Sequence, residues 1–140
     1  MAALQIARLN KSFGGLPATN DVSLEVASGE RRLIIGPNGA GKTTLFNLIT
    51  GDLAPDEGSV RLFDEEITRL RPDQRAHKGL ARTYQIITLF PKDTLEHNIV
   101  LSLLGLSRQR WNLWGAFSAI RGFQEEARRV LAMVGLEALA

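Results

Sequence analysis

Gly36-Pro37-Asn38-Gly39-Ala40-Gly41-Lys42-Thr43-Thr44 carries the strongest structural signal in this chain of 140 residues. It has a glycine, four free residues and then Gly-Lys-Thr, which is the spacing of a phosphate-binding loop. Residues 31–35 before it are mostly apolar and predict a short buried strand. Residues 42–50 after it predict a helix, which Gly51 is placed to end. A strand, a glycine-rich loop and a helix thus follow in the order that a nucleoside-triphosphate site requires.

The residue types of this loop suit phosphate and magnesium. Gly36, Gly39 and Gly41 let the backbone bend tightly and bring N–H groups against phosphate oxygens. The positive end of the following helix points at the same place. Lys42 is expected to reach the β- and γ-phosphates, and the hydroxyl of Thr43 to bind Mg²⁺. The alternative is a glycine-rich turn with an incidental lysine, which the flanking strand and helix disfavour.

Composition indicates one globular unit, because 44% of the residues are hydrophobic and 23% are charged. The formal net charge of +2 is too small to argue for nucleic acid. Cysteine is absent, which excludes disulfides and thiolate metal sites and is consistent with a reducing compartment. The apolar run 99–106 is too short to span a bilayer, and no signal peptide is evident. We therefore expect an intracellular protein. Arginines at positions 69, 71, 75 and 82 are expected to be solvated, with some attraction for phosphate.

Alternating apolar residues predict several strands around the one helix. Leu4, Ile6 and Leu9 fit a first strand, and Val22, Leu24 and Val26 fit a second. Residues 14–17 mark the turn between them, and 59–63 alternate as another strand. This pattern predicts an α/β arrangement with some antiparallel pairing.

The second half of the chain predicts helices after one further strand. Residues 67–75 are expected to form a surface helix or loop with Pro72 near a helix start, and 80–84 to form a strand. A helix is predicted to begin at Asp93, whose side chain would cap it with Glu96 as capping-box partner. Residues 107–122 are ambiguous, whereas 123–134 predict a helix with one apolar stripe, stopped by Gly135.

Several segments together resemble one family, the ATP-binding cassette (ABC) transporter ATPase subunits. They are the opening Leu9–Gly15, the segment Asp21–Val26 with Gly29-Glu30, the loop 36–44, and Gly79–Gln85 followed by Leu89-Phe90. The last of these is similar to the subfamily that serves branched-chain amino-acid importers. The resemblance implies a P-loop NTPase core with an amino-terminal antiparallel β subdomain and a helical subdomain, present only in part. Residues 1–85 would hold the β subdomain with the P-loop segment, and 86–140 the helical segment.

By the same resemblance, Phe13 would stack on adenine, and Gln85 would contact Mg²⁺ and the γ-phosphate region. Ordinary alternatives are a partly buried strand-end Phe13 and a surface Gln85. Lys42 and Gln85 are then the catalytic candidates, and Thr43 and Gln85 the metal candidates. The nucleotide-binding residues would be Phe13, Gly36, Pro37, Asn38, Gly39, Ala40, Gly41, Lys42, Thr43 and Thr44. Trp111 and Trp114 fit either a contact with membrane subunits or packing between helices.

The function implied by the resemblance is that of an ATP-binding subunit which couples ATP binding and hydrolysis to import of branched-chain amino acids or similar small solutes. Its expected cofactors are ATP and Mg²⁺. Its expected partners are membrane permease subunits, a second ATPase subunit and, indirectly, a solute-binding protein, with no nucleic acid. It would be cytoplasmic and peripheral on the inner face of the membrane.

The family's signature motif, its Asp-Glu strand and its switch histidine are not among these residues, so we expect an amino-terminal fragment with little hydrolysis of its own. The alternatives are a nucleotide-binding or subunit-contact module without turnover, and a non-transport ABC ATPase.

Overall fold

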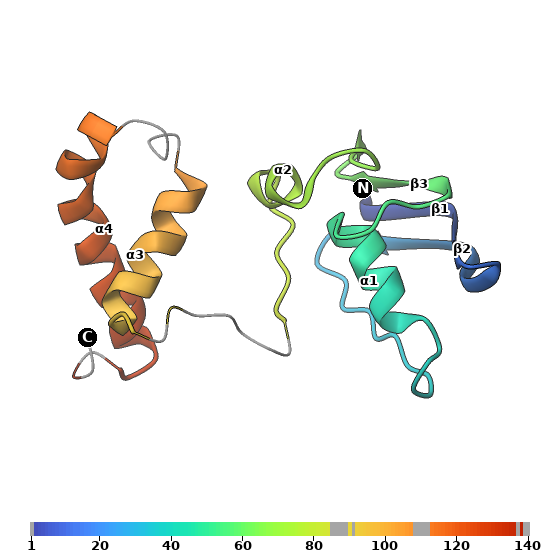
Figure 1. Cartoon of the computed structure of the whole chain (residues 1–140), viewed down its shortest axis with the longest axis horizontal. Coiled ribbons are helices and arrows are strands. Elements are labelled where there is room, and N and C mark those ends of the chain that lie inside the picture. Colours follow the sequence, from blue (N-terminus) through green and yellow to red (C-terminus); the bar gives the residue numbers. More distant parts are fainter. Residues whose placement is uncertain (1, 85–89, 91, 108–112, 137, 139–140) are drawn as a thin grey trace. The chain divides into compact units, whose positions relative to one another are not determined.

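The computed structural model describes residues 2–84, 90, 92–107, 113–136 and 138. The chain divides into two compact units, residues 1–83 and residues 84–140, which are described separately below (Figure 1). Gln85 and Trp111, both singled out from the sequence, lie outside the described residues, as does the side chain of Trp114.

The first unit contains an antiparallel sheet with strand order β2-β1-β3-β4. Its strands are β1 (Ala2–Phe13), β2 (Leu16–Ala27), β3 (Glu57–Leu62) and β4 (Glu65–Glu66). Gly14 and Gly15 make the turn between β1 and β2 with φ of 53° and 82°, a backbone region that glycine enters without steric strain. The predicted first two strands and their antiparallel pairing are confirmed, and the turn predicted at 14–17 is confined to residues 14–15.

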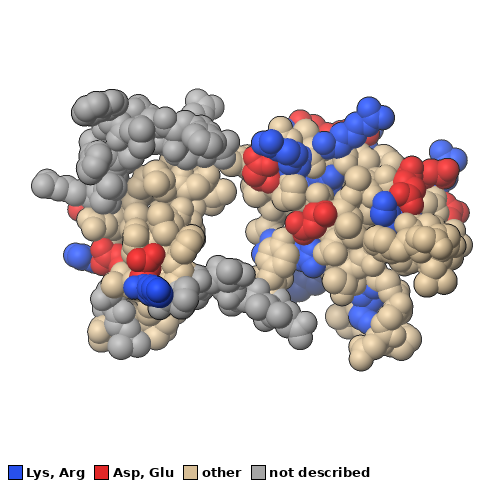
Figure 2. Space-filling view, in the orientation of Figure 1, with Lys and Arg blue, Asp and Glu red and all other residues tan. Residues whose placement is uncertain are grey.

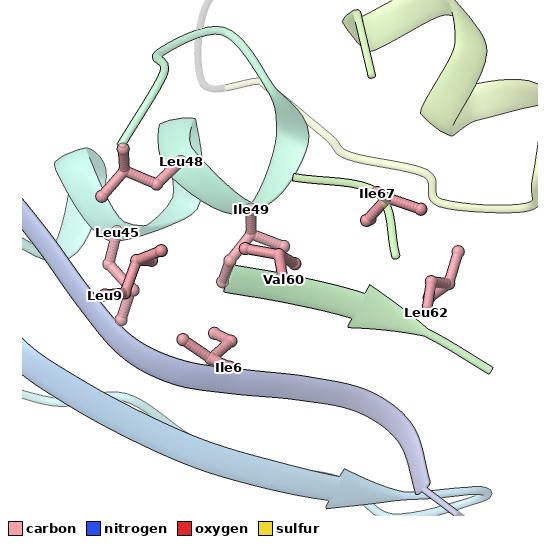
Figure 3. Packing of buried hydrophobic residues seen from close by; sticks show 8 residues of the cluster. All are labelled: Ile6, Leu9, Leu45, Leu48, Ile49, Val60, Leu62 and Ile67. Atoms are coloured by element: carbon pink, nitrogen blue, oxygen red, sulfur yellow. The ribbon is translucent and has the colours of Figure 1, made fainter. Parts of the chain in front are cut away.

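One helix, α1 (Lys42–Thr50), supplies the other side of the core in this unit. Figure 3 shows its side chains packed against those of β1 and β3. The buried cluster consists of Ile6, Leu9, Leu45, Leu48, Ile49, Val60, Leu62 and Ile67. Burial of each such side chain contributes about 1.5–3 kcal/mol, which fixes α1 on the sheet. The predicted helix and its stop are confirmed, since Gly51 caps α1 with φ of 85°.

Two predicted strands are wrong in this structure. Residues 31–35 and 80–84 have no strand assignment. The side chains of Leu33 and Ile35 are 83% and 81% exposed, and only Ile34 packs against the core. A strand needs a ladder of hydrogen bonds to a neighbour, and no described strand pairs with either segment. Apolar patterning alone therefore predicted sheet where pairing is missing.

The predicted solvation of Arg75 is also wrong. Its side chain is buried, with 1% of the residue exposed, in the short helix α2 (Pro72–His77). Its guanidinium donates hydrogen bonds to four backbone carbonyl oxygens, which replace the water that a surface arginine would bind. The predicted helix start is confirmed, because Pro72 occupies the first turn of α2.

The second unit pairs α3 (Leu95–Leu106) with α4 (Leu113–Met133), which pack against each other. The predicted cap at Asp93 is wrong, because Thr94 is the N-cap and its hydroxyl accepts a hydrogen bond from the amide of His97 at 3.1 Å. Glu96 instead forms an ion pair with Arg128 of α4, at 3.0 Å.

The ambiguous stretch 107–122 contributes residues from 113 onward to α4, so the helix is longer than predicted. The predicted apolar stripe is buried only in part. Ala127 and Leu131 are buried, whereas Val130 and Val134 are exposed. The stop at Gly135 is confirmed by its φ of 71° just after α4. No helix among the described residues is long and apolar enough to cross a membrane.

Candidate nucleotide site

The loop 36–41 runs directly into the amino end of α1. The first hydrogen bond of this helix joins the amide of Leu45 to the carbonyl of Gly41, at 2.9 Å. The amides of residues 42–44 come before that bond and have no partner within the helix. Gly41 supplies no side-chain cap for them. These amides and the positive end of the helix therefore suit an anion such as a phosphate group.

The loop is compact because its glycines admit close approaches. A Cβ on Gly36 would lie 3.3 Å from the Cβ of Ala40, and the amide of Ala40 donates to the carbonyl of Pro37 at 3.3 Å. Gly39 has φ of 82° and Gly41 has φ of 78°. Alternation of left-handed glycines with other residues turns several N–H groups toward one side, which forms an anion-binding concavity.

Gly41 also fixes the loop against β2. A Cβ at Gly41 would lie only 2.2 Å from the carbonyl oxygen of Ala18, far inside van der Waals contact. The backbones of loop and sheet thus meet at a distance that only glycine permits. No sequence motif marks this role of Ala18, because the contact exists only in the folded chain.

The ammonium group of Lys42 lies over its own loop. Nζ donates hydrogen bonds to the carbonyl oxygens of Gly36 and Pro37, at 2.6 Å and 2.7 Å. No carboxylate of the described residues forms an ion pair with Lys42, so carbonyl dipoles alone balance its charge. An ammonium group has a third donor and a full charge to offer an incoming anion.

Thr43 is the loop residue best suited to a metal ion, because it is exposed at the start of α1 and carries a hydroxyl. Thr44 is half-buried, and Pro37, Asn38 and Ala40 are exposed. No group of three or more His, Asp or Glu among the described residues could hold a metal by itself. This donor set fits Mg²⁺, which commonly takes one or two protein ligands together with phosphate oxygens and water.

Phe13 lies on the hairpin that contacts this loop. It ends β1, pairs with Leu16 of β2 and is 49% exposed. The Nζ of Lys11 lies 5.8 Å from the centroid of its ring. Ala18, which meets Gly41, belongs to the same hairpin. The structure thus brings the hairpin and the phosphate loop together. The role of Phe13 in stacking and the placement of Gln85 stay predictions.

A protein-family model described as "ABC transporter" matches residues 19–140. The chain is 43% identical over 99 residues to the high-affinity branched-chain amino acid transport ATP-binding protein BraF of Pseudomonas aeruginosa. It is 41% identical over 99 residues to LivG of Escherichia coli K12, described in the same words. Each match covers 71% of this chain and 39% of the relative. The chain thus spans about two fifths of the length of these curated relatives.

Solved structures give the same result for the fold. A nucleotide-free ATP-binding cassette from an ABC transporter superposes with a TM-score of 0.79 at 33% identity. The ADP conformation of such a cassette superposes with a TM-score of 0.80 at 33% identity. Each match covers 99% of this chain and 56% of the cassette. The family resemblance and the α/β fold class predicted from the sequence are confirmed. The chain belongs to the ABC transporter family, and its fold is that of part of an ATP-binding cassette.

Proposed function

We propose that this chain is the nucleotide-binding part of an ABC transporter ATP-binding subunit and that it binds MgATP in the loop 36–44. The observation that carries the proposal is that the glycine-rich loop 36–41 runs directly into the amino end of α1. The first turn of α1 carries the amides of residues 42–44 and the hydroxyl of Thr43, and the ammonium of Lys42 lies against the carbonyl oxygens of Gly36 and Pro37 in the adjoining loop. A triphosphate with its Mg²⁺ supplies the negative charge and the metal that these groups suit.

Each group has a role that follows from its position. The amides of residues 42–44 would hold phosphate oxygens, and Lys42 would turn its third donor to the terminal phosphates. Thr43 would complete the coordination of Mg²⁺. Phe13 offers an exposed ring face on the adjoining hairpin for the base. We keep Gln85 as the candidate for contact with Mg²⁺ and, with Lys42, for hydrolysis.

The relatives support import of branched-chain amino acids, or of similar small solutes, as the process that the whole protein serves. BraF and LivG are named for branched-chain amino acid transport. The partners would then be membrane permease subunits, a second ATP-binding subunit and, indirectly, a solute-binding protein. The protein would work on the cytoplasmic face of the membrane. A nucleic-acid partner is not proposed, since charges of both signs are interspersed on the face shown in Figure 2.

Substitution of Lys42 tests the site. We expect Lys42→Ala to weaken MgATP binding about 30-fold, because a charge-assisted hydrogen bond to phosphate is worth roughly 1.5–3 kcal/mol. Isothermal titration with MgATP measures this. Lys78→Ala is the matched control, because Lys78 is also partly exposed but lies at the carboxyl end of α2, where it forms an ion pair with Glu65. Equal affinity in the unmodified chain and Lys42→Ala would contradict the assignment.

A second candidate function is a nucleotide-binding or subunit-contact module without turnover. It is favoured by the described part of the site, which offers amides, Lys42 and Thr43 for binding but no group of three or more His, Asp or Glu that could hold a metal by itself. On this view the chain binds MgATP but releases almost no phosphate, because positioning and charge stabilisation by further groups carry most of phosphoryl transfer. A steady-state phosphate-release assay, with Lys42→Ala as the blank, measures this. Sustained release that depends on Lys42 would refute the module.

A further inference from the structure

Two arginines from the sequence after the sheet hold the carboxyl end of α1. Nη1 of Arg75 donates hydrogen bonds to the carbonyl oxygens of Leu48 and Ile49, at 2.8 Å and 2.7 Å. Its other nitrogens donate to the carbonyl oxygens of Leu70 and Thr68, at 2.9 Å and 2.7 Å. Arg75 thus joins the last turn of α1 to the loop before α2.

Arg82 binds the same end of the helix through side chains. Its Nη1 lies 2.7 Å from Oδ1 of Asn47, 3.1 Å from Oγ1 of Thr50 and 3.1 Å from Oδ2 of Asp52. The contact with Asp52 is an ion pair in which the two side chains are 19% and 32% exposed. Partial burial of both charges reduces screening by water and salt. One guanidinium nitrogen therefore donates to two side chains of the last turns of α1 and to Asp52 just beyond the helix.

Residues 81–83 lie outside the helices and strands that the structure describes. The strand expected at 80–84 is not formed, so no sheet ladder fixes this backbone. Leu80 is partly buried against the core, and its amide donates to the carbonyl of Arg75 at 3.1 Å. Beyond Leu80, the side chain of Arg82 carries the hydrogen bonds that tie the segment to α1.

The helix α1 connects the hydrogen bonds of Arg82 to the phosphate loop. It has nine residues, with Gly41 at one end and the acceptors of Arg82 at the other. Leu45, Leu48 and Ile49 are buried along it, so close packing makes the short helix move as one body. A change in order at the amino end of α1 can therefore alter the order of its carboxyl end.

We infer that Arg82 is a positioning residue that couples occupancy of the phosphate loop to the order of residues 80–83. This inference rests on the proposed function, since it takes MgATP as the occupant. In the sequence, residue 82 comes three positions before Gln85, so the coupled segment leads into that candidate residue. Such coupling is reciprocal. The factor by which MgATP favours the ordered state of residues 80–83 is therefore also the factor by which loss of that order weakens MgATP binding.

Hydrogen exchange and titration on the same chains test the coupling. We expect MgATP to slow amide exchange both at residues 36–50 and at residues 80–83 of the unmodified chain. In Arg82→Met, the protection at 36–50 should persist and that at 80–83 should disappear, with MgATP binding weakened about 3- to 10-fold. Arg82→Lys should retain part of the effect, because an ammonium can still donate to several of the three acceptors. Arg69→Met, an exposed site in the preceding loop, is the matched control.

The possible results distinguish a failure of the Arg82 coupling from a failure of MgATP binding in the loop 36–44. No response of residues 36–50 to MgATP in the unmodified chain overturns the proposed function and the coupling with it. Two results overturn the coupling alone, provided that MgATP slows amide exchange at residues 36–50. The first is equal protection of residues 80–83 in the unmodified chain and in Arg82→Met. The second is a lack of protection at residues 80–83 in the unmodified chain.

If Arg82→Met does not fold, Asp52→Asn removes the ion pair with a side chain of the same shape but leaves Asn47 and Thr50 as acceptors. The protection of residues 80–83 by MgATP should then fall in part, and unchanged protection overturns the coupling.

Discussion

Arg75→Met is expected to lower the free energy of unfolding of the first unit by about 3–5 kcal/mol. Methionine fills similar space but donates no hydrogen bond. The four carbonyl oxygens that now accept from the guanidinium, those of Leu48, Ile49, Thr68 and Leu70, would lose a charged donor in a buried place. Each unsatisfied buried group costs about 1–3 kcal/mol, and water that enters the site would recover part of this.

The charge of Arg75 contributes to this effect. Burial lowers the pKa of the Arg75 guanidinium below its usual range, while the nearby carboxylate of Asp52 opposes the shift. The group stays charged at neutral pH, where a cation at the carboxyl end of α1 interacts favourably with the helix dipole. Gly51 makes room for it, since a Cβ there would lie 2.8 Å from Nε of Arg75. Loss of the cation therefore removes both the donors and a favourable charge.

Urea unfolding, followed by far-ultraviolet circular dichroism, measures the loss for Arg75→Met. Arg69→Met is the control, because Arg69 lies on the same segment but is exposed, and we expect it to change the free energy of unfolding by less than about 0.5 kcal/mol. A result within that same range for Arg75→Met would show that the buried hydrogen bonds contribute little. With typical stabilities of roughly 5–15 kcal/mol, the expected loss is a large share of the total.

Local patterns predicted the parts of this fold that depend on local interactions. The helix at 42–50 needs its own amphipathic pattern and a glycine stop, both of which lie in adjacent sequence. The hairpin of β1 and β2 needs alternation and the glycine turn between them. The glycine-rich loop leads into α1 as its residue spacing predicted, and its binding of phosphate stays a prediction.

Features that depend on distant partners were not predictable in this way. Residues 31–35 have the composition of a buried strand, but a strand exists only beside another strand. An arginine is usually exposed, and nothing near Arg75 in the sequence shows that helix carbonyls will surround it. The contact between Gly41 and Ala18 likewise joins residues far apart in the chain. For the candidate site, the sequence pattern therefore named the candidate binding residues, whose roles stay predictions, but not the contacts that support them.

Gly41→Ala is expected to weaken MgATP binding about 100-fold or more, because it forces the phosphate loop away from β2. The new Cβ would lie 2.2 Å from the carbonyl oxygen of Ala18, and backbone on both sides leaves no flexible side chain to yield. Relief of the overlap needs a shift of about 1 Å, the scale at which positioned groups lose their alignment with a bound ligand. The amides of residues 42–44 and the ammonium of Lys42 would move with the loop.

Gly39→Ala is the matched control for the close approach. Gly39 has φ of 82°, close to the 78° of Gly41, yet a Cβ there would meet nothing within 4 Å. Both substitutions cost about 1–2 kcal/mol of backbone strain, so only Gly41→Ala adds the overlap with Ala18. We expect Gly41→Ala to be less stable to urea than Gly39→Ala by about 1–3 kcal/mol, the range for overpacking. Equal stability of the two variants would show that β2 yields to the loop, and the support assigned to Ala18 would then be wrong.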